Sequence, residues 1–516
     1  MIHSNFALSL LTWLELAFIT VIGIGLLIVV FMYVVDITQS THTIRKNYPV
    51  IGRFRYFFEH LGEFFRQYFF AQDREEMPFN RADRSWVYRA AKNVDSNIAF
   101  GSTLNLSQPG TLIFLNSPFP ILDADSIPIL PVTLGPFCKK PYTTSSIFNI
   151  SAMSYGAISR PAILALSQGA AKAGCWLNTG EGGLSPYHLA GNCDLVFQIG
   201  TAKYGVRDTS GNLSDQRLQE LAAIDQIKMF EIKLSQGAKP GKGGILPAEK
   251  VSLEVAQIRG IPQGEASISP NGHTDIRSVI DLLDMVGRVR SHTGKPVGFK
   301  AVMGERRWLV DLVHEIRVRG IESAPDFITL DSGDGGTGAA PQPLMDNVGL
   351  PVKESLPWLS GLLEEAGLKD RIKIVVAGKL ITPAMVAWAL ASGADFINSA
   401  RGFMFALGCI QALQCHKNTC PTGITTHNAK LQKGLDPTDK ATRVAAYQHN
   451  LTKSVAMIAH SCGVIDPRQL KAEHIHLVMP NGFSRPMHEV QPQPINLLGD
   501  IKQDVGQAST NNISLS

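Results

Sequence analysis

Eight short apolar runs, rich in β-branched residues, recur between residues 147 and 399, and each leads through glycine or serine into a stretch of helical character. This alternation is typical of parallel strands joined by crossover helices. Because eight such units occupy about 250 residues, we expect an α/β fold in the form of a closed (β/α)8 TIM barrel, with a doubly wound open sheet as the alternative. The expected strands are residues 147–151, 175–179, 195–199, 229–234, 296–302, 327–331, 373–378 and 395–399.

Small residues and glycines follow these runs at their carboxyl ends, where such a barrel carries its chemistry. Glycine-rich turns leave backbone N–H groups free to bind phosphate, and the loops after the seventh and eighth strands are the customary phosphate site. Each glycine alone could simply form a turn, but together they favour a phosphorylated cofactor. The candidate phosphate ligands are Gly378, Ala400 and Arg401, and the further candidate cofactor ligands are Ala152, Met153 and Ser154 after the first strand and Gly335 and Gly336 after the sixth.

Two lysines, Lys233 and Lys300, lie inside apolar runs. A lysine within a strand is costly unless its ammonium finds a partner, and one that reaches the mouth of a barrel is a candidate ligand for an anion. The alternative is a lysine that snorkels to solvent or forms a salt bridge.

Three cysteines, Cys409, Cys415 and Cys420, follow the barrel with the spacing C-x5-C-x4-C, and Pro421 comes next. Soft thiolate ligands on a loop that cannot continue as a helix suit an iron–sulfur cluster, and three of them suggest a cluster that lacks one iron. A zinc ion bound by the three cysteines and His416, or a set of buried structural thiols, are the alternatives. The other cysteines, Cys138, Cys175, Cys193 and Cys462, are interpreted as ordinary buried thiols.

The run of 20 uncharged residues from Leu16 to Val35 is long enough to span a hydrocarbon core of about 30 Å as a helix. A cleaved signal peptide and a buried core helix are the alternatives. Arg45, Lys46 and further basic residues follow the run and none precedes it. The positive-inside rule therefore predicts a single-pass protein of the cell inner membrane, with its catalytic domain in the cytoplasm.

Residues 48–70 mix aromatic and basic side chains, as segments at membrane interfaces do, although an amphipathic helix packed on the domain would look the same. The overall charge excludes another class of partner. With 48 basic and 44 acidic residues and 45% hydrophobic residues, the chain is neither disordered nor built to coat nucleic acid.

Six motifs between residues 147 and 427 resemble the FMN-binding central domain of glutamate synthase. They are ISAMSYGAIS (150–159), NTGEGG (178–183), IKLSQGAKPGKGGILP (232–247), ISPNGHTDI (268–276), GDGGTGA (333–339) and ALGCIQALQCHKNTCPTG (406–423). The cysteine spacing is similar to that of the family's three-iron cluster, and the apolar amino-terminal run resembles the short, membrane-anchored, stand-alone members.

This resemblance implies FMN in the barrel, a [3Fe-4S] cluster beside it, and reduction of 2-iminoglutarate, formed from 2-oxoglutarate and ammonia, to L-glutamate. It implies that Lys233, Gln236, Lys239 and Arg259 bind the keto acid, and that Glu181 lies near the cluster and the flavin. Lys300 would lie at the N1/O2 edge of the flavin and bind the cofactor. The catalytic candidates are Glu181, Lys233 and Lys239.

The sequence also departs from the complete members of the family. Ile2 stands where their glutaminase domain has its nucleophilic cysteine, no β-helix is expected after Thr426, and the turn after the seventh expected strand reads VVAGK. No G-x-G-x-x-G follows a strand, so we expect electrons from a partner such as ferredoxin or a reductase subunit, and nitrogen as ammonia or from a separate amidotransferase subunit.

We expect four regions: an anchor (1–40), a juxtamembrane and pre-barrel extension (41–145), the barrel with its cysteine loop (146–427) and a helical carboxyl-terminal extension (428–516). A related flavin enzyme for another keto acid or amine, such as an N-alkylglutamate synthase, and a membrane electron-transfer flavoprotein are the alternative functions.

Overall fold

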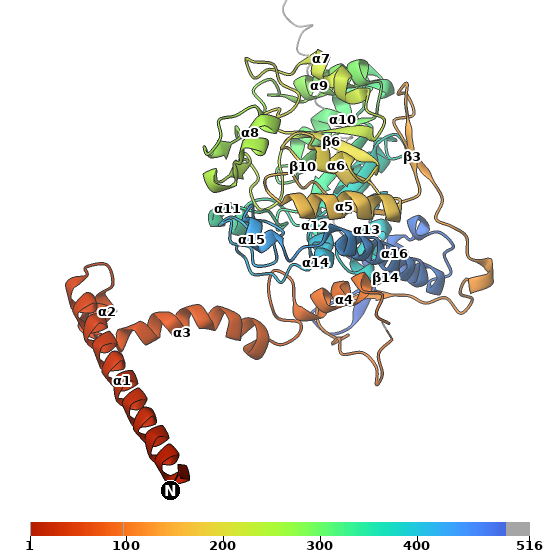
Figure 1. Cartoon of the computed structure of the whole chain (residues 1–516). Helices are drawn as coiled ribbons and strands as arrows, with labels where there is room; N and C mark the ends of the chain where they lie inside the picture. Colours follow the sequence, from red (N-terminus) through yellow and green to blue (C-terminus); the bar gives the residue numbers. More distant parts are fainter. Residues whose placement is uncertain (1, 96, 492–516) are drawn as a thin grey trace, which may run out of the picture. The chain divides into compact units, whose positions relative to one another are not determined.

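The computed structural model describes residues 2–95 and 97–491. The chain divides into two compact units, Met1–Ala82 and Asp83–Ser516 (Figure 1).

Eight parallel strands form a closed barrel in the second unit, which confirms the TIM barrel. Each strand overlaps one of the eight apolar runs, and the ring closes where β13 pairs with β4 through Asn398 and Asn149. The strands are β4 (Phe148–Ile150), β5 (Leu177–Asn178), β6 (Leu195–Ile199), β7 (Ile227–Lys233), β10 (Val297–Val302), β11 (Phe327–Asp331), β12 (Lys373–Ala377) and β13 (Phe396–Ser399).

The crossover helices begin and end at residues suited to those positions. Helix α5 (Arg160–Ala173) starts at Ser159, whose side chain accepts from the backbone N–H of Ala162, and ends at Gly174 in the left-handed conformation. Helix α13 (Pro383–Ala391) starts after Thr382 with proline in its first turn. The other helices of this region are α6 (Pro186–Leu189), α7 (Asp215–Ala222), α8 (Leu253–Arg259), α9 (Val279–Thr293), α10 (Arg307–Arg319), α11 (Gln342–Asn347), α12 (Val352–Glu365) and α14 (Arg401–Leu407).

A β-hairpin closes the amino-terminal end of the barrel. Strands β2 (Val132–Leu134) and β3 (Tyr142–Thr144) pair with each other, and Leu134 and Tyr142 pack in one buried cluster with residues from the barrel strands. The barrel members of that cluster are Trp176, Val196, Met229, Phe327, Val375 and Phe396. The opposite end, where the carboxyl ends of the strands meet, is therefore the mouth of the barrel.

Between residues 428 and 491 the chain forms helices and also contributes two strands. Helices α15 (Ala429–Gln432), α16 (Pro437–Ser461) and α17 (Met487–Val490) follow the barrel, and α16 packs against α5. Strand β14 (Ile475–Val478) pairs with β15 (Ser484–Pro486) and with the distant β1 (Leu112–Phe114). A further short pair, β8 (Ile245–Leu246) and β9 (Ser267–Ile268), lies in the loops after β7.

The first unit is helical. It contains α1 (Ile2–Thr38), α2 (Thr43–Asn47), α3 (Gly52–Phe65) and a π-helical turn, η1 (Arg66–Phe70), and helix α4 (Arg81–Ala91) begins at its end. Within α1, Ser9–Thr38 is long and apolar enough, by length and composition, to cross a membrane.

Candidate active site at the mouth of the barrel

Glu181 and Lys233 form an ion pair at the mouth. Lys233 is the last residue of β7 and Glu181 lies in the loop after β5, and Nζ of the lysine is 2.9 Å from Oε1 of the glutamate. Burial alone would raise the pKa of Glu181, but the ammonium of Lys233, with further cations nearby, holds it below its ordinary value. Lys233 also donates to Oε1 of Gln236. Since an ammonium has three N–H groups, one remains for a ligand.

Two more cations lie close to this pair. Lys239 is only 3% exposed, and no ion pair or side-chain hydrogen bond of its ammonium is found within residues 2–95 and 97–491. Burial, with the nearby charge of Lys233, lowers the pKa of Lys239 to about 8. Arg259 donates to Oγ of Ser267 (3.2 Å) and to the carbonyl of Tyr155 (3.3 Å). Its Nε is buried and has no partner among the residues that the structure describes.

Glycines enclose the carboxylate of Glu181 on two sides. A Cβ on Gly244 would lie 2.2 Å from Oε1 of Glu181, and one on Gly200 would lie 2.5 Å from its Cβ. The structure thus brings together Glu181, Lys233, Gln236, Lys239 and Arg259, of which the three cations are buried and the other two half-buried. We call this set the mouth cluster.

Lys300 has an acidic partner. Its ammonium lies 2.9 Å from Oδ2 of Asp331, the last residue of β11, and that oxygen also accepts from the backbone N–H of Gly237. Burial alone would lower the pKa of Lys300, but Asp331 and Glu231 raise it overall, so the side chain stays charged. Both strand lysines therefore form salt bridges in this structure, Lys233 with Glu181 and Lys300 with Asp331.

The loops after β11, β12 and β13 meet at a tight contact. Nη2 of Arg401 donates to the carbonyl of Thr337 (2.5 Å), and a Cβ on Gly336 would lie 2.8 Å from Nε of Arg401. Gly378 has a φ of +136°, and its Cβ would lie 2.2 Å from that of Ser332. Gly378 must therefore be glycine, and the small size of both residues lets the three loops approach one another closely.

The remaining cofactor candidates lie around the same mouth. Ala400 is the residue before α14, and Gly335 lies in the β11 loop close to the carbonyl of Ser332. Ala152, Met153 and Ser154 follow β4, and the last two lie against the end of β5 and the loop after it. The backbone N–H of Met153 donates to the carbonyl of Asn178 (3.3 Å), and a Cβ on Gly180 would lie 2.6 Å from the nitrogen of Ser154.

The three cysteines lie on the loop between α14 and α15, with Cys409 and Cys420 buried and Cys415 half-buried. Burial raises the pKa of Cys409 to about 11. Burial would also raise that of Cys420, but hydrogen bonds with Thr422 and Thr425 lower it overall. Nη1 of Arg401 lies 3.9 Å from Sγ of Cys415. Of the four remaining cysteines, three are buried as expected, but Cys138 is half-buried because it lies at the rim of the barrel's closed end.

In the described part of the chain, no three His, Cys, Asp or Glu side chains are placed to share one metal ion. The zinc alternative therefore finds no support here. An iron–sulfur cluster binds each cysteine through a different iron atom, so its ligands need not converge on one point.

Several residues of this region were missed by sequence reasoning. Glu231, two residues before Lys233 on β7, accepts hydrogen bonds from Asn178, Gln198 and Thr329 inside the barrel. An acidic residue within an apolar run, on the same face as a lysine, was the available signal. Lys250 is also buried, and its ammonium donates to the carbonyls of Cys415 (2.7 Å) and Ala157 (3.1 Å). No local pattern indicates that role.

His273 is a third such residue. One ring nitrogen contacts the carbonyl of Lys233 (3.0 Å), while Nδ1 is buried without a partner among the described residues. Burial lowers the pKa of His273 below its ordinary value.

The fold and this site define an α/β-barrel protein whose mouth gathers buried cations around one carboxylate, beside a loop with three cysteines. The family model described as "Conserved region in glutamate synthase" matches residues 131–465. The chain therefore belongs to the glutamate synthase family, which confirms the resemblance of the motifs.

The chain is similar to several members of this family. It is 40% identical over 496 residues to the glutamate synthase large subunit-like protein YerD of Bacillus subtilis, covering 89% of this chain and 94% of YerD. It is 31% identical over 363 residues to a glutamate synthase large subunit-like protein of Rhizobium meliloti, covering 67% of this chain and 78% of that protein. The archaeal-type glutamate synthase [NADPH] of Dehalococcoides mccartyi is 33% identical over 329 residues, and the chain spans only 62% of its length.

Proposed function

We propose that this protein reduces 2-iminoglutarate, formed from 2-oxoglutarate and ammonia, to L-glutamate. The observation that carries this proposal is the mouth cluster, in which Lys233, Lys239 and Arg259 are held within electrostatic reach of the one carboxylate of Glu181. Three cations against one anion leave an excess of positive charge, which suits a dicarboxylate substrate. A protein that only holds a flavin for electron transfer has no use for this excess.

The roles of the cluster residues follow from their contacts. Lys239 and Arg259 bind the carboxylates of the keto acid. Among the described residues, the buried ammonium of Lys239 has no ion pair and the buried Nε–H of Arg259 has no partner. Glu181 and Gln236 fix the ammonium of Lys233, whose remaining N–H is directed to the substrate and can supply a proton to it. Burial of the cluster excludes water from these contacts.

We propose FMN as the cofactor of the mouth. The glycine-rich loops after β11 and β12 support this assignment, because Gly336 and Gly378 let these loops pack closely against Arg401 and Ser332 at the mouth, and such turns leave backbone N–H groups free to bind phosphate. The residues that would hold FMN are Ala152, Met153, Ser154, Lys300, Gly335, Gly336, Gly378, Ala400 and Arg401. When bound, FMN supplies a hydride to an electrophilic carbon and can accept electrons singly.

We propose Cys409, Cys415 and Cys420 as the ligands of a [3Fe-4S] cluster. The donor set fits, since three thiols without disulfide partners lie on one loop, with the charges of Arg401 and Lys250 beside them. Such a cluster supplies single electrons. Its electrons come from a ferredoxin-like protein or a reductase subunit, and the nitrogen comes as ammonia or from an amidotransferase subunit.

We also propose that α1 anchors the protein in the cell inner membrane, with the barrel in the cytoplasm. The support is the length and apolar composition of Ser9–Thr38, together with the basic residues that follow it.

The test of the proposed function is Lys239→Ala. We expect the KM for 2-oxoglutarate to rise about 10- to 150-fold, because a charge-assisted hydrogen bond in a desolvated site contributes roughly 1.5–3 kcal/mol. The amount of FMN released on denaturation should stay at the wild-type level. Lys242→Ala is the matched control, since Lys242 is exposed on the same loop, and its kinetics should not change.

Two results would count against the assignment. Loss of flavin in Lys239→Ala would indicate that Lys239 binds the cofactor. Unaltered kinetics with 2-oxoglutarate would contradict the proposal that the substrate is this dicarboxylate. Methylamine assayed beside ammonia distinguishes an N-alkylglutamate synthase from the proposed enzyme.

A further inference from the structure

Helix α3 has an apolar face made of aromatic side chains. Phe54, Phe57, Phe58, Leu61 and Phe65 are spaced three or four residues apart, which places them on one side of a helix. Phe54, Phe57 and Phe58 are 59%, 57% and 61% exposed. Tyr56 lies on the opposite side, where its ring packs against that of His42. Such a row of exposed phenylalanines needs an apolar environment to cover it.

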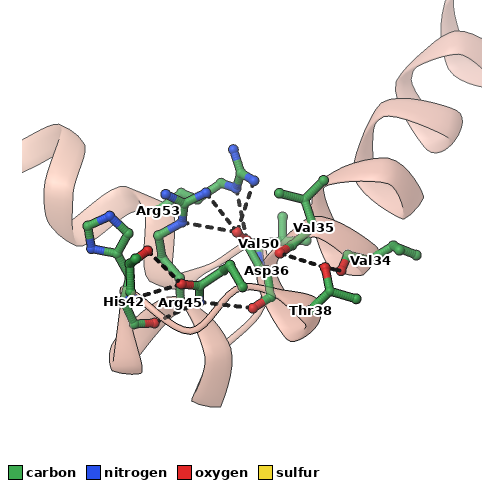
Figure 2. A network of polar contacts seen from close by, with 10 residues as sticks. Val34, Val35, Asp36, Thr38, His42, Arg45, Val50 and Arg53 are labelled. Atoms are coloured by element: carbon green, nitrogen blue, oxygen red, sulfur yellow. Dashed lines mark hydrogen bonds and ion pairs between the residues drawn. The ribbon is translucent and has the colours of Figure 1, made fainter.

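The start of α3 is fixed to the end of α1 by one buried carboxylate. Asp36, in the last turn of α1, is fully buried and accepts from both Arg45 and Arg53 (Figure 2). Arg53 binds both carboxylate oxygens, at 2.8 and 2.9 Å, and the backbone N–H of Val50 donates at 3.0 Å. We call this arrangement the Asp36 clamp.

The clamp sets the depth at which α3 begins. The apolar part of α1 ends at Thr38, so Asp36 marks the boundary between hydrocarbon and water if α1 spans the bilayer. Because Arg53 belongs to the first turn of α3 and binds Asp36 directly, α3 starts at that boundary. Figure 1 shows α3 leaving the end of α1 sideways. A helix that starts there with one aromatic face and one polar face has the features of an interfacial helix.

We infer that α3 lies in the plane of the membrane surface, with Phe54, Phe57 and Phe58 inserted among the lipids, and that the Asp36 clamp sets this orientation. The inference rests on the proposed anchoring by α1. It commits to a lipid bilayer as the occupant of the aromatic face, because that face continues directly from the end of the spanning helix.

The test is site-specific photocrosslinking of the full chain in vesicles of phosphatidylethanolamine and phosphatidylglycerol. A photoreactive phenylalanine analogue replaces Phe58 on the aromatic face, Tyr56 on the opposite face, or Leu27 in the middle of α1. We expect lipid adducts, detected by mass spectrometry, at positions 27 and 58 and none above background at position 56.

The outcomes separate the two proposals. Lipid adducts at position 27 with crosslinks from position 58 to barrel peptides, or to a second copy of the chain, would overturn the inference while leaving the anchor in place. Equal lipid adducts at positions 56 and 58 would also overturn it. Absence of lipid adducts at position 27 would contradict the proposal that α1 anchors the protein in the membrane.

A second variant tests the clamp. Asp36→Asn keeps the shape of the side chain but loses the charge that holds two arginines, so the preference for lipid at position 58 over position 56 should be lost. Asp73→Asn is the matched control, because Asp73 pairs with Arg81 on the surface of the same unit, and it should keep the preference. If Asp36→Asn keeps it too, the clamp does not orient α3.

Discussion

At the scale of single residues, burial of Lys239 disfavours the charged form of its side chain. The ammonium is the form that binds a carboxylate, yet burial and the charge of Lys233 lower the pKa of Lys239 to about 8. A lysine is charged below its pKa and neutral above it. We therefore predict that kcat/KM for 2-oxoglutarate falls as the pH rises through about 8, because this ratio reports the groups of the free enzyme.

Lys239→Arg provides the control for this pH profile. A guanidinium keeps its charge throughout the accessible range, so the fall above pH 8 should disappear in this variant even if the absolute rate is lower. Lys242→Arg should keep the wild-type profile. Persistence of the fall in Lys239→Arg would assign it to another group.

Lys250 places a buried positive charge against the cysteine loop. A nearby cation stabilises the reduced, more negative state of an iron–sulfur cluster and so raises its reduction potential. We predict that Lys250→Met shifts the midpoint potential of the cluster to more negative values, as measured by a redox titration at pH 7 followed by electron paramagnetic resonance.

The matched control is Lys417→Met, which removes an exposed charge two residues from Cys415. Solvent screens that charge, so its shift should be smaller. Cys415→Ser should lose the iron signals altogether, which tests the ligand assignment. Equal shifts in the two lysine variants would mean that burial of Lys250 does not matter for the potential.

The sequence indicated which residues are candidates for the site, but it did not indicate which side chains contact one another there. Lys233 and Glu181 were both named as catalytic candidates without a contact between them, and the structure joins them at 2.9 Å. The pairing of Lys300 with Asp331 could not be predicted, because it depends on the register of β10 against β11. That register is set by the packing of the whole barrel, and the sequence of neither strand indicates it.

At the scale of elements, structure formed by residues close together in the sequence was predictable, whereas pairing between distant segments was not. The barrel was predictable because each strand is followed by its own helix, so the pattern repeats along the chain. The sheet of β1, β14 and β15 was not, because β1 has three residues and its partner lies more than 350 residues away. So short a run carries no periodicity that could be recognised.

The contact between α5 and α16 gives a prediction at this scale. A Cβ on Gly169 in α5 would lie 2.5 Å from Cβ of Val444 and 2.9 Å from the carbonyl of Ala441 in α16. Gly169→Ala must push the helices apart, and we expect a loss of about 1–3 kcal/mol in the free energy of unfolding.

Gly287→Ala in α9 is the control, since nothing lies within 4 Å of its Cβ. That change should stabilise the protein by roughly 0.5–1 kcal/mol through helix propensity. Thermal unfolding of both variants measures the difference. An unchanged Tm in Gly169→Ala would mean that α16 can move away from α5 at little cost.

At the scale of the whole molecule, the chain joins a family barrel to a helical amino-terminal unit. The family model matches residues 131–465, whereas the likeness to YerD covers 89% of the chain and so reaches beyond that region. The first unit contains a polar cluster of its own around Asp36. Arg45 and Arg53 are engaged by Asp36, while Lys46 and Arg55 remain exposed after the apolar run.

These charges predict the topology of the chain. No lysine or arginine precedes Leu16, and four follow within twenty residues of Val35. The positive-inside rule counts basic residues and gives little weight to acidic ones, so the Asp36 clamp does not cancel them. We expect an alkaline phosphatase reporter joined after residue 60 to be inactive and a fluorescent protein at the same place to be bright. Adding lysines before Leu16 while replacing Lys46 and Arg55 with glutamine should weaken this preference. An active phosphatase in the unaltered chain would place the residues after α1, and the barrel with them, outside the cytoplasm.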